Sequence, residues 1–330
     1  MSKNTYKQSG VNVFLGDLAS AESTILSRKT FRPEVKDLGS FVGFTAKFKK
    51  YKTPLLLGAT DGVGTKLKIA FSAGKHETVG IDLVAMSVND LLRRGAEPLI
   101  FLPYFAFGKI DVRVAAKISA GIVAGCRMAN CAIIGGETAE LPGFYHPGEY
   151  DLAGTAIGVV EEKKVITGEK IKTGDRILAL PSNGLHSNGY SLARKVLLDH
   201  YKLSDRPKEL GGKTLASEFL TPTKIYVAEV MKILGLGIEI HGLAHITGGG
   251  VNSKLGKIIP KGLSAQIDFT SWQPPPIFGL IQKLGEVSDN EMFSTFNMGL
   301  GMVMVLPEKS VARVKKQLKE TLEIGTVVQI

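Results

Sequence analysis

Apolar runs bounded by glycine or proline alternate with helical stretches twice along this chain, and this alternation constrains the fold more than any other feature. The first series lies between residues 55 and 160, where four apolar runs have the length and composition of strands and helical stretches at 80–95 and 112–129 separate them. The second series is expected to contain strands at 176–181, 238–246 and 300–307 and helices at 191–201 and 308–323. Two such series predict two α/β domains of similar size.

The boundary between the two domains is expected near residue 166. Residues 161–175 are charged and rich in turn formers, and a chain of 330 residues exceeds what one hydrophobic core usually supports. We therefore expect an N-terminal domain over 1–166 and a C-terminal domain over 167–330.

Two of the expected helices carry clear local signals. Helix 112–129 follows Asp111, a suitable N-cap, and its alanine and glycine content predicts a thin helix that lies close against a sheet. Helix 308–323 has one apolar stripe, formed by Val311, Val314, Leu318 and Leu322.

Composition and charge narrow the class of protein. Hydrophobic residues make up 44% of the chain and charged residues 22%, which is typical of a soluble globular protein. Cys126 and Cys131 fit two buried thiols in a reducing compartment, and the polar start has no apolar signal segment, so a cytoplasmic protein is expected. No apolar run is long enough to span a membrane.

The net charge of +10 allows two interpretations. The basic segment 47–52, KFKKYK, contains interleaved aromatics, which would suit nucleic acid. However, no nucleic-acid-binding motif accompanies it, and most other basic residues share helices with acidic ones. A general attraction for anionic metabolites is favoured, and no nucleic-acid partner is expected.

The segment ATDGVGTKLKIA, 59–70, has the composition of a strand that runs into a phosphate-binding turn. It matches neither the Walker A nor the Rossmann glycine pattern. Asp61, at the strand end beside Gly62, could hold Mg²⁺ while the amides freed by glycine approach phosphate oxygens. An ordinary Asp-Gly turn is the alternative for this pair alone.

Polar residues also interrupt the apolar helix 80–95. At about 100° per residue, Asp82 and Asn89 lie within about 20° of each other, and Asp90 is displaced by about 80°. Unpaired polar groups in such a helix would be costly. A metal or phosphate ligand would explain them, and so would a buried cap or a salt bridge to the neighbouring arginines.

A third acidic strand end follows in IIGGETAELPG, 133–143, with Glu137, Thr138 and Glu140. No histidine lies near these carboxylates at metal-ligand spacing, which disfavours zinc or iron. Oxygen ligands alone fit Mg²⁺ that bridges ATP phosphates.

Glycine turns in the second domain suit an anionic substrate. In LPSNGLHSNGYS, 180–191, Asn188 and backbone amides precede a helix, and His186 is either a catalytic base or a structural residue of the turn. Further turns, compatible with a phosphorylated substrate, contain Thr247, Gly248, Gly249, Thr295 and Asn297.

Read in order, these segments resemble the phosphoribosylformylglycinamidine cyclo-ligase family, also called aminoimidazole ribonucleotide synthetases. The matching motifs include TDGVGTKLKIA, GIDLVAMSVNDLLRRGAEPL, GGETAELPGFY, HSNGYSL, LTPTKIYV, HITGGG and EMFSTFNMGLGM. The resemblance implies ATP-dependent ring closure of formylglycinamidine ribonucleotide, two related α/β (α+β-like) domains, and a homodimer formed through the N-terminal sheet.

The resemblance also implies roles for individual residues. Metal binding falls to Asp61 and Asp90. Nucleotide binding falls to Tyr6, Lys7, Gly10, Gly62, Gly64, Thr65, Lys66 and Asn89. Ribonucleotide binding falls to His186, Ser187, Asn188, Gly189, Thr247, Gly248, Gly249, Thr295 and Asn297. Catalytic roles fall to His186, Glu137 and Lys66. The segments at 11–17 and 37–44 match the family less well, so no role is carried over to them.

Other proteins of the superfamily offer alternative functions. A thiamine-monophosphate kinase would share the acidic strand ends, but not HSNGYSL or LTPTKIYV. Selenophosphate synthetase would need a reactive cysteine near the N-terminus, and the first cysteine here is Cys126. A nucleic-acid-binding protein would show affinity that falls steeply with salt, and no turnover.

Overall fold

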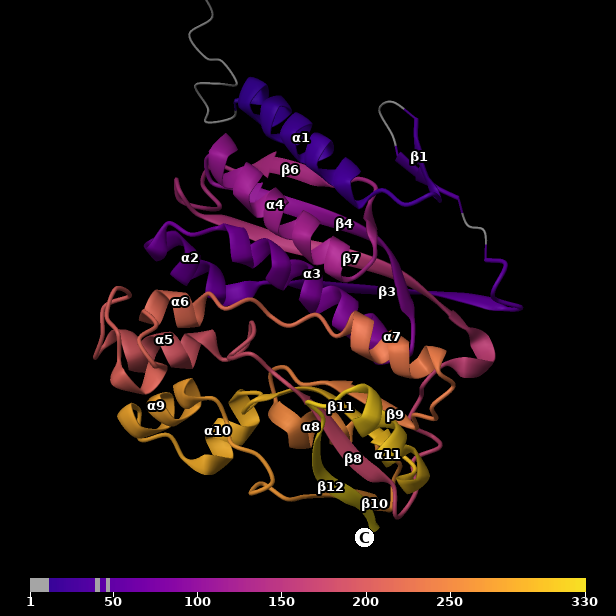
Figure 1. The fold of residues 1–330 in the computed structure, drawn as a ribbon. Helices are drawn as coiled ribbons and strands as arrows, with labels where there is room; N and C mark the ends of the chain where they lie inside the picture. Colours follow the sequence, from indigo (N-terminus) through magenta and orange to yellow (C-terminus); the bar gives the residue numbers. More distant parts are fainter. Residues whose placement is uncertain (1–11, 39–41, 46–47) are drawn as a thin grey trace, which may run out of the picture.

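The strand and helix signals of the sequence resolve into two stacked domains in the computed structural model, which describes residues 12–38, 42–45 and 48–330 (Figure 1). The last strand of the first domain ends at Glu161, and the first strand of the second domain begins at Arg176. We keep residue 166, between these two points, as the proposed boundary.

The sheet of the first domain is mixed. Its neighbouring strands are β3, β7, β4 and β5 in that order, and β6 also pairs with β4. β7 is antiparallel to both neighbours, whereas β5 and β6 run parallel to β4. The strands are β3 (Pro54–Gly62), β4 (Glu97–Phe107), β5 (Ala132–Ile133), β6 (Glu137–Glu140) and β7 (Tyr150–Glu161). A separate antiparallel pair consists of β1 (Val35–Asp37) and β2 (Val42–Phe44).

Helices cover one face of this sheet. Buried residues alternate along β7 with half-exposed ones such as Ala153, Thr155 and Ile157, which is the pattern of a sheet packed on one face. α3 packs against β3 and β7, and α4 lies beside α3 (Figure 1). The helices are α1 (Val13–Ser27), α2 (Leu67–Ala73), α3 (Glu77–Leu92) and α4 (Val112–Met128), with short 3₁₀ turns η1 (Arg28–Thr30), η2 (Gly64–Lys66) and η3 (Glu162–Lys164).

The second domain has an antiparallel sheet in the order β10, β12, β8, β11, β9. Its strands are β8 (Arg176–Pro181), β9 (Gly242–His245), β10 (Leu263–Ile267), β11 (Leu300–Leu306) and β12 (Leu322–Gln329). Its helices are α5 (Tyr190–Leu198), α6 (Leu215–Phe219), α7 (Val227–Gly235), α8 (Gly250–Gly256), α9 (Pro276–Leu284), α10 (Asp289–Thr295) and α11 (Glu308–Gln317), with η4 (Lys208–Leu210) before α6.

Most expected elements are present, with two corrections at their ends. The N-cap at Asp111 is confirmed, because its Oδ1 accepts hydrogen bonds from the amides of Arg113 and Val114 at 2.9 and 3.4 Å. The helix expected over 308–323 ends at Gln317, and Leu322 begins a strand that the sequence analysis did not predict. That strand forms because β12 pairs with both β8 and β10, and tertiary pairing overrides helical periodicity.

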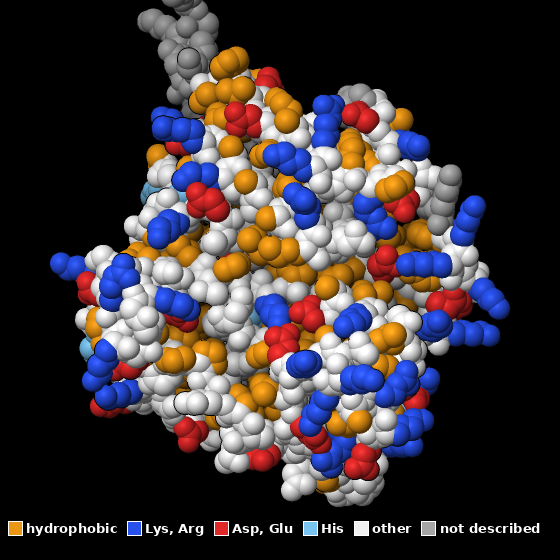
Figure 2. Space-filling model, viewed as in Figure 1, with side chains coloured by type: hydrophobic (Ala, Val, Ile, Leu, Met, Phe, Trp, Pro, Cys, Tyr) orange, Lys and Arg blue, Asp and Glu red, His pale blue; other side chains and the backbone are white. Residues whose placement is uncertain are grey.

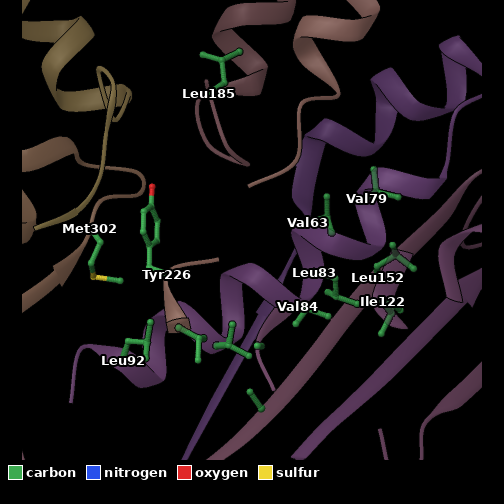
Figure 3. Packing of buried hydrophobic residues seen from close by; sticks show 14 of the residues in the cluster. Val63, Val79, Leu83, Val84, Leu92, Ile122, Leu152, Leu185, Tyr226 and Met302 are labelled. Carbon is green, nitrogen blue, oxygen red and sulfur yellow. The ribbon is translucent and has the colours of Figure 1, made fainter. Parts of the chain in front are cut away.

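The hydrophobic core crosses the domain boundary. One cluster joins residues of α3 and α4 in the first domain to residues of α5, α7 and β11 in the second, and Figure 3 shows members from both, including Leu83, Leu185, Tyr226 and Met302. A second cluster lies within the second domain alone. Cys126 and Cys131 are buried free thiols, as expected. Among the described helices, none has the length and apolarity needed to cross a membrane.

Candidate functional site

The end of β3 forms the first part of the site. Asp61 is half-buried there, and its Oδ1 accepts a hydrogen bond from the amide of Gly62 at 2.7 Å. Gly64 has φ +71° with open space around it, so backbone conformation, and not crowding, favours glycine at this turn. The hydroxyl of Thr65 lies 3.3 Å from that of Ser191, which brings the turn to the start of the second domain's α5.

Asp90 forms the second part, near Asp61. Burial raises the pKa of Asp61, and the charge of Asp90 adds to this shift. Burial acts in the same sense on Asp90, but its hydrogen bond with His245 and the charge of Arg93 outweigh that effect and hold its pKa below the ordinary value. Lys254, on α8 of the second domain, is close enough to influence both carboxylates. Two half-buried carboxylates near each other form an oxygen ligand set that suits a divalent cation.

His245 is a partner that the sequence analysis missed. Its Nδ1 donates to Asp90 Oδ1 at 3.1 Å, and its side chain is fully buried. No histidine lies near the carboxylates at metal-ligand spacing along the sequence, but β9 brings His245 to α3 across the domain boundary. The HITGGG motif, which begins at His245, was the available signal. Within the described ranges there is no cluster of three or more histidine, cysteine, aspartate or glutamate residues that could hold a metal by itself.

Lys66 does not fit the role carried over to it. Its side chain is fully buried and is paired with Asp82 of α3. Burial lowers the pKa of Lys66, and the charge of Asp82 opposes that shift. The ammonium group therefore does not point to an open surface where phosphate could bind.

His186 is also buried, with 1% of its surface exposed, and its backbone is left-handed at φ +60°. Burial lowers the pKa of the imidazole well below its ordinary value. Its Nε2 accepts from the amide of Lys224 at 3.5 Å. These contacts favour the structural alternative over the role of a base in contact with substrate.

Glu137 is separated from the other carboxylates. The pairing of β3, β7 and β4 aligns Asp61 with Gly154 and Pro103, whereas Glu137 pairs with the next residue, Tyr104. Strands lie about 4.8 Å apart, so Glu137, three strands away from Asp61, lies about 14 Å from it. Within one chain, therefore, Glu137 does not lie near Asp61 and Asp90, and that expectation was wrong.

Asn89 does not fit the nucleotide-binding role carried over to it either. It is buried, and its amide group bonds the backbone of Lys224 and Tyr226.

The remaining predicted residues divide into half-buried and structural ones. Ser187, Asn188, Gly189 and Thr247 are half-buried, and Asn188 Oδ1 lies close to Gly248. By contrast, Asn297 is buried and bonds Ser182, Gly184 and Gly299, so it ties turns together. Thr295 donates to Glu291 at 3.0 Å on α10. Tyr6, Lys7 and Gly10 lie outside the described residues.

A cavity of about 390 Å³ lies between α1, α4 and the first sheet. Its walls combine hydroxyl groups with apolar side chains, the mixture usual in small-molecule sites. Glu137 and Thr138 lie at this cavity. The other lining residues include Ser20, Ser23, Thr24, Ser27, Pro103, Phe105, Ser119, Ile122, Gly135 and Gly136.

Charged side chains of both signs cover the face of the molecule that Figure 2 shows. Figure 2 shows basic side chains spread over this face and interspersed with acidic ones, with a small charged group at the middle, where the two domains meet. The described residues form no continuous basic stripe on this face of the kind that tracks a nucleic-acid backbone.

The two halves of the chain match two family models. The N-terminal domain of AIR synthase related proteins matches residues 49–160, and the C-terminal domain of the same proteins matches residues 172–329. The chain thus contains both domains of an AIR synthase related protein.

Two curated relatives narrow this class. The chain is 51% identical to a phosphoribosylformylglycinamidine cyclo-ligase of Myxococcus xanthus, over 98% of this chain and 95% of the relative. It is also 51% identical to a protein of the same name from Citrifermentans bemidjiense, over 99% and 94%. The chain belongs to the phosphoribosylformylglycinamidine cyclo-ligase family.

Solved structures with similar folds are more distant. The hydrogenase maturation protein HypE in complex with ATP has a TM-score of 0.67 at 17% identity, covering 92% of this chain and 84% of that one. Thiamine-monophosphate kinase from Stenotrophomonas maltophilia has a TM-score of 0.67 at 16% identity, covering 93% of both. At these identities the likeness shows the fold alone.

Proposed function

We propose that this enzyme uses ATP to close the imidazole ring of aminoimidazole ribonucleotide from formylglycinamidine ribonucleotide, with release of ADP and phosphate. The observation that carries the proposal is the 51% identity, over 98% of the chain, to a relative named for this activity. We also infer that it acts in the cytoplasm, as a step of purine biosynthesis.

The chemistry requires activation of an amide oxygen, which is a poor leaving group. Transfer of the γ-phosphoryl group of ATP to the formyl oxygen forms an imidate phosphate and ADP. An amidine nitrogen then attacks the same carbon and loses a proton. The carbon–oxygen bond breaks, and its oxygen leaves as part of the phosphate. Phosphoryl transfer depends mainly on positioning and charge stabilisation.

Asp61 and Asp90 would hold Mg²⁺, which neutralises phosphate charge when it is bound. Proteins often bind Mg²⁺ through one or two carboxylates together with substrate phosphates, so the absence of a larger ligand cluster among the described residues is compatible with this role. Gly64 and Thr65 would bring backbone amides toward the phosphates, whereas the amide of Gly62 donates to Asp61. Ser187 and Asn188 would face the ribonucleotide from the second domain.

A second location for the metal–nucleotide is the cavity that Glu137 lines beneath α1. The proposed nucleotide residues Tyr6, Lys7 and Gly10 precede α1 in the sequence. Mg²⁺ would be held by Asp61 and Asp90 at the first location and by Glu137 at the second. Substitution of each carboxylate in turn would distinguish the two locations.

We further propose a homodimer in which the half-exposed face of the first sheet contacts a second copy of the chain. Leu56 on β3 and Tyr104 on β4 expose 55% and 39% of their surface, and they flank the half-exposed residues of β7. Apolar residues in a row on an exposed sheet face are typical of an interface.

The direct test of the function is a reaction containing purified chain, ATP, Mg²⁺ and formylglycinamidine ribonucleotide. We expect aminoimidazole ribonucleotide and ADP in equal amounts. ATP consumption without imidazole product would reject the proposal. Phosphorylation of thiamine monophosphate, tested in parallel, would support the kinase alternative.

A further inference from the structure

Lys66 uses all of its hydrogen-bonding capacity at the boundary between the domains. Its nitrogen lies 2.9 and 2.8 Å from the two carboxylate oxygens of Asp82. It also donates to the carbonyl oxygens of His186 at 2.9 Å and Thr221 at 2.7 Å. An ammonium group has three protons to donate, so none is left for a phosphate. Two of its three partners belong to the second domain.

Asp82 binds the same two segments of the second domain. Its Oδ1 accepts from the amide and the hydroxyl of Thr223, both at 2.7 Å, and from the hydroxyl of Ser187 at 3.2 Å. The side chains of Lys66 and Asp82 have no exposed surface. A buried ion pair is often no more stabilising than apolar residues of similar size, which points to a role in fixing a particular arrangement.

Asn89 makes a second attachment on the same side of α3. It lies seven residues beyond Asp82, about 10 Å along the helix axis. Its side chain accepts from the amide of Tyr226 at 3.0 Å and donates to the carbonyl of Lys224 at 2.8 Å. The helix thus holds residues 221–226 at two points, and the close angular spacing of Asp82 and Asn89 has a structural explanation.

The turn that Lys66 contacts has a strained backbone and a donor group suited to a ligand. The left-handed backbone of His186, at φ +60°, is unfavourable for a non-glycine residue, and the ammonium group of Lys66 on its carbonyl stabilises that conformation. The next residues, Ser187 to Gly189, are half-buried. Nδ2 of Asn188 is a buried donor without a partner among the described residues. Such a donor is suited to an acceptor oxygen of a bound ligand.

We propose that Lys66 and Asp82 are positioning residues that fix the Ser187–Gly189 turn of the second domain so that it can bind the ribonucleotide opposite the end of β3. The identity of this ligand rests on the proposed function, whereas the attachment of the turn rests on the contacts alone. Neither side chain touches the substrate.

The central test removes both charges together in Lys66→Met/Asp82→Asn, because either change alone leaves an uncompensated buried charge. We expect the double variant to raise the KM for formylglycinamidine ribonucleotide by about tenfold or more, since small displacements of a binding group are costly. The KM for ATP should change less than about twofold, because the proposed nucleotide residues belong to the first domain.

A milder variant, Thr223→Val, covers the case in which the double variant does not fold. It removes one hydrogen bond to Asp82 without burying a charge, and the same selective rise in KM is expected. Ser87→Ala is the matched control, because Ser87 is a buried hydroxyl on the same helix that bonds Gly154 inside the first domain at 3.1 Å. It should lower the melting temperature without changing the KM for the ribonucleotide.

Hydrogen exchange supplies a readout that does not depend on turnover. The amides of Ser187, Asn188 and Gly189 should exchange faster in Thr223→Val and in the double variant than in the wild type or in Ser87→Ala. Wild-type KM for the ribonucleotide together with wild-type exchange at these amides would overturn the proposal. A wild-type chain without turnover would reject the proposed function, and the exchange comparison would still decide whether the ion pair positions the turn.

Discussion

Carboxylates of one residue type have different roles in this chain according to their surroundings. Asp82 is fully buried, its charge is paired with Lys66 and its Oδ1 accepts two hydrogen bonds from Thr223, whereas Asp61 is half-buried and accepts one amide hydrogen bond from its own turn. A carboxylate with a paired charge and no exposed surface is closed to a metal. Asp61 and Asp90 are only half-buried, and for this reason the proposed metal role stays with them.

Substitution of Asp61 by asparagine should separate metal binding from folding. Asp61→Asn keeps the shape of the side chain but removes the charge that would bind Mg²⁺. We expect the KM for Mg²⁺–ATP to rise about tenfold or more, since interactions with charged groups are worth about 1.5–3 kcal/mol. The melting temperature without metal should not fall, because burial and Asp90 already disfavour the charge of Asp61.

Glu137→Gln is the matched comparison for Asp61→Asn, because Glu137 is an exposed carboxylate of the same sheet, three strands away from Asp61. Normal activity of Asp61→Asn at limiting Mg²⁺ would contradict the metal assignment. If Glu137→Gln shows the loss instead, the metal–nucleotide binds at the cavity beneath α1.

Among the secondary-structure elements, α3 and α4 lie so close together that their glycines have no room for a side chain. A Cβ atom added to Gly121 of α4 would lie 1.9 Å from the carbonyl oxygen of Glu77, and one added to Gly80 of α3 would lie 2.3 Å from that of Ile118. The glycines of α4, the thin helix predicted from the sequence, therefore allow close contact with α3. The prediction had placed this close contact at the sheet.

Gly121→Ala should destabilise the protein by about 1–3 kcal/mol, because overpacking moves the two helices apart. Gly279→Ala is the control, since Gly279 is an exposed position inside α9 with no atom within 4 Å of an added Cβ. That change should stabilise by about 0.5–1 kcal/mol through helix propensity. Chemical denaturation measures both. Equal effects of the same sign would show that the spacing of α3 and α4 is not limited by these glycines.

On the scale of the whole molecule, the first sheet has one face against helices and one face with half-exposed residues. We expect light scattering at micromolar concentration to give about twice the chain mass of 35.4 kDa. Leu56→Glu should shift the protein toward monomer, because a charge would be buried at the proposed interface.

Leu236→Glu is the control for Leu56→Glu, because Leu236 is a 47% exposed leucine at the end of α7 in the second domain. It should leave the mass unchanged. A wild-type mass of 35.4 kDa would contradict the dimer, and a Leu56→Glu variant that keeps the dimeric mass would place the interface elsewhere.

The sequence by itself determined the features that depend on neighbours along the chain. Hydrophobic periodicity located most strands and helices, Asp111 was recognised as a cap, and the ordered motifs gave the family. The half-buried carboxylates Asp61 and Asp90 were also found from local patterns, because a strand end followed by glycine and a polar interruption in an apolar helix are local signals.

Only the tertiary structure decided which polar residues are free to bind ligands. Lys66 and His186 were assigned to chemistry because motif position does not reveal burial, and the Lys66 side chain bonds the carbonyl of His186 across 120 residues of sequence. His245 was missed for the same reason, since β9 brings it to Asp90 from 155 residues along the chain. Likewise, Leu322 was assigned to a helix because pairing with β8 and β10 is set by distant strands. Local patterns record what each segment can form, whereas burial and pairing depend on contacts that exist only once the two domains pack together.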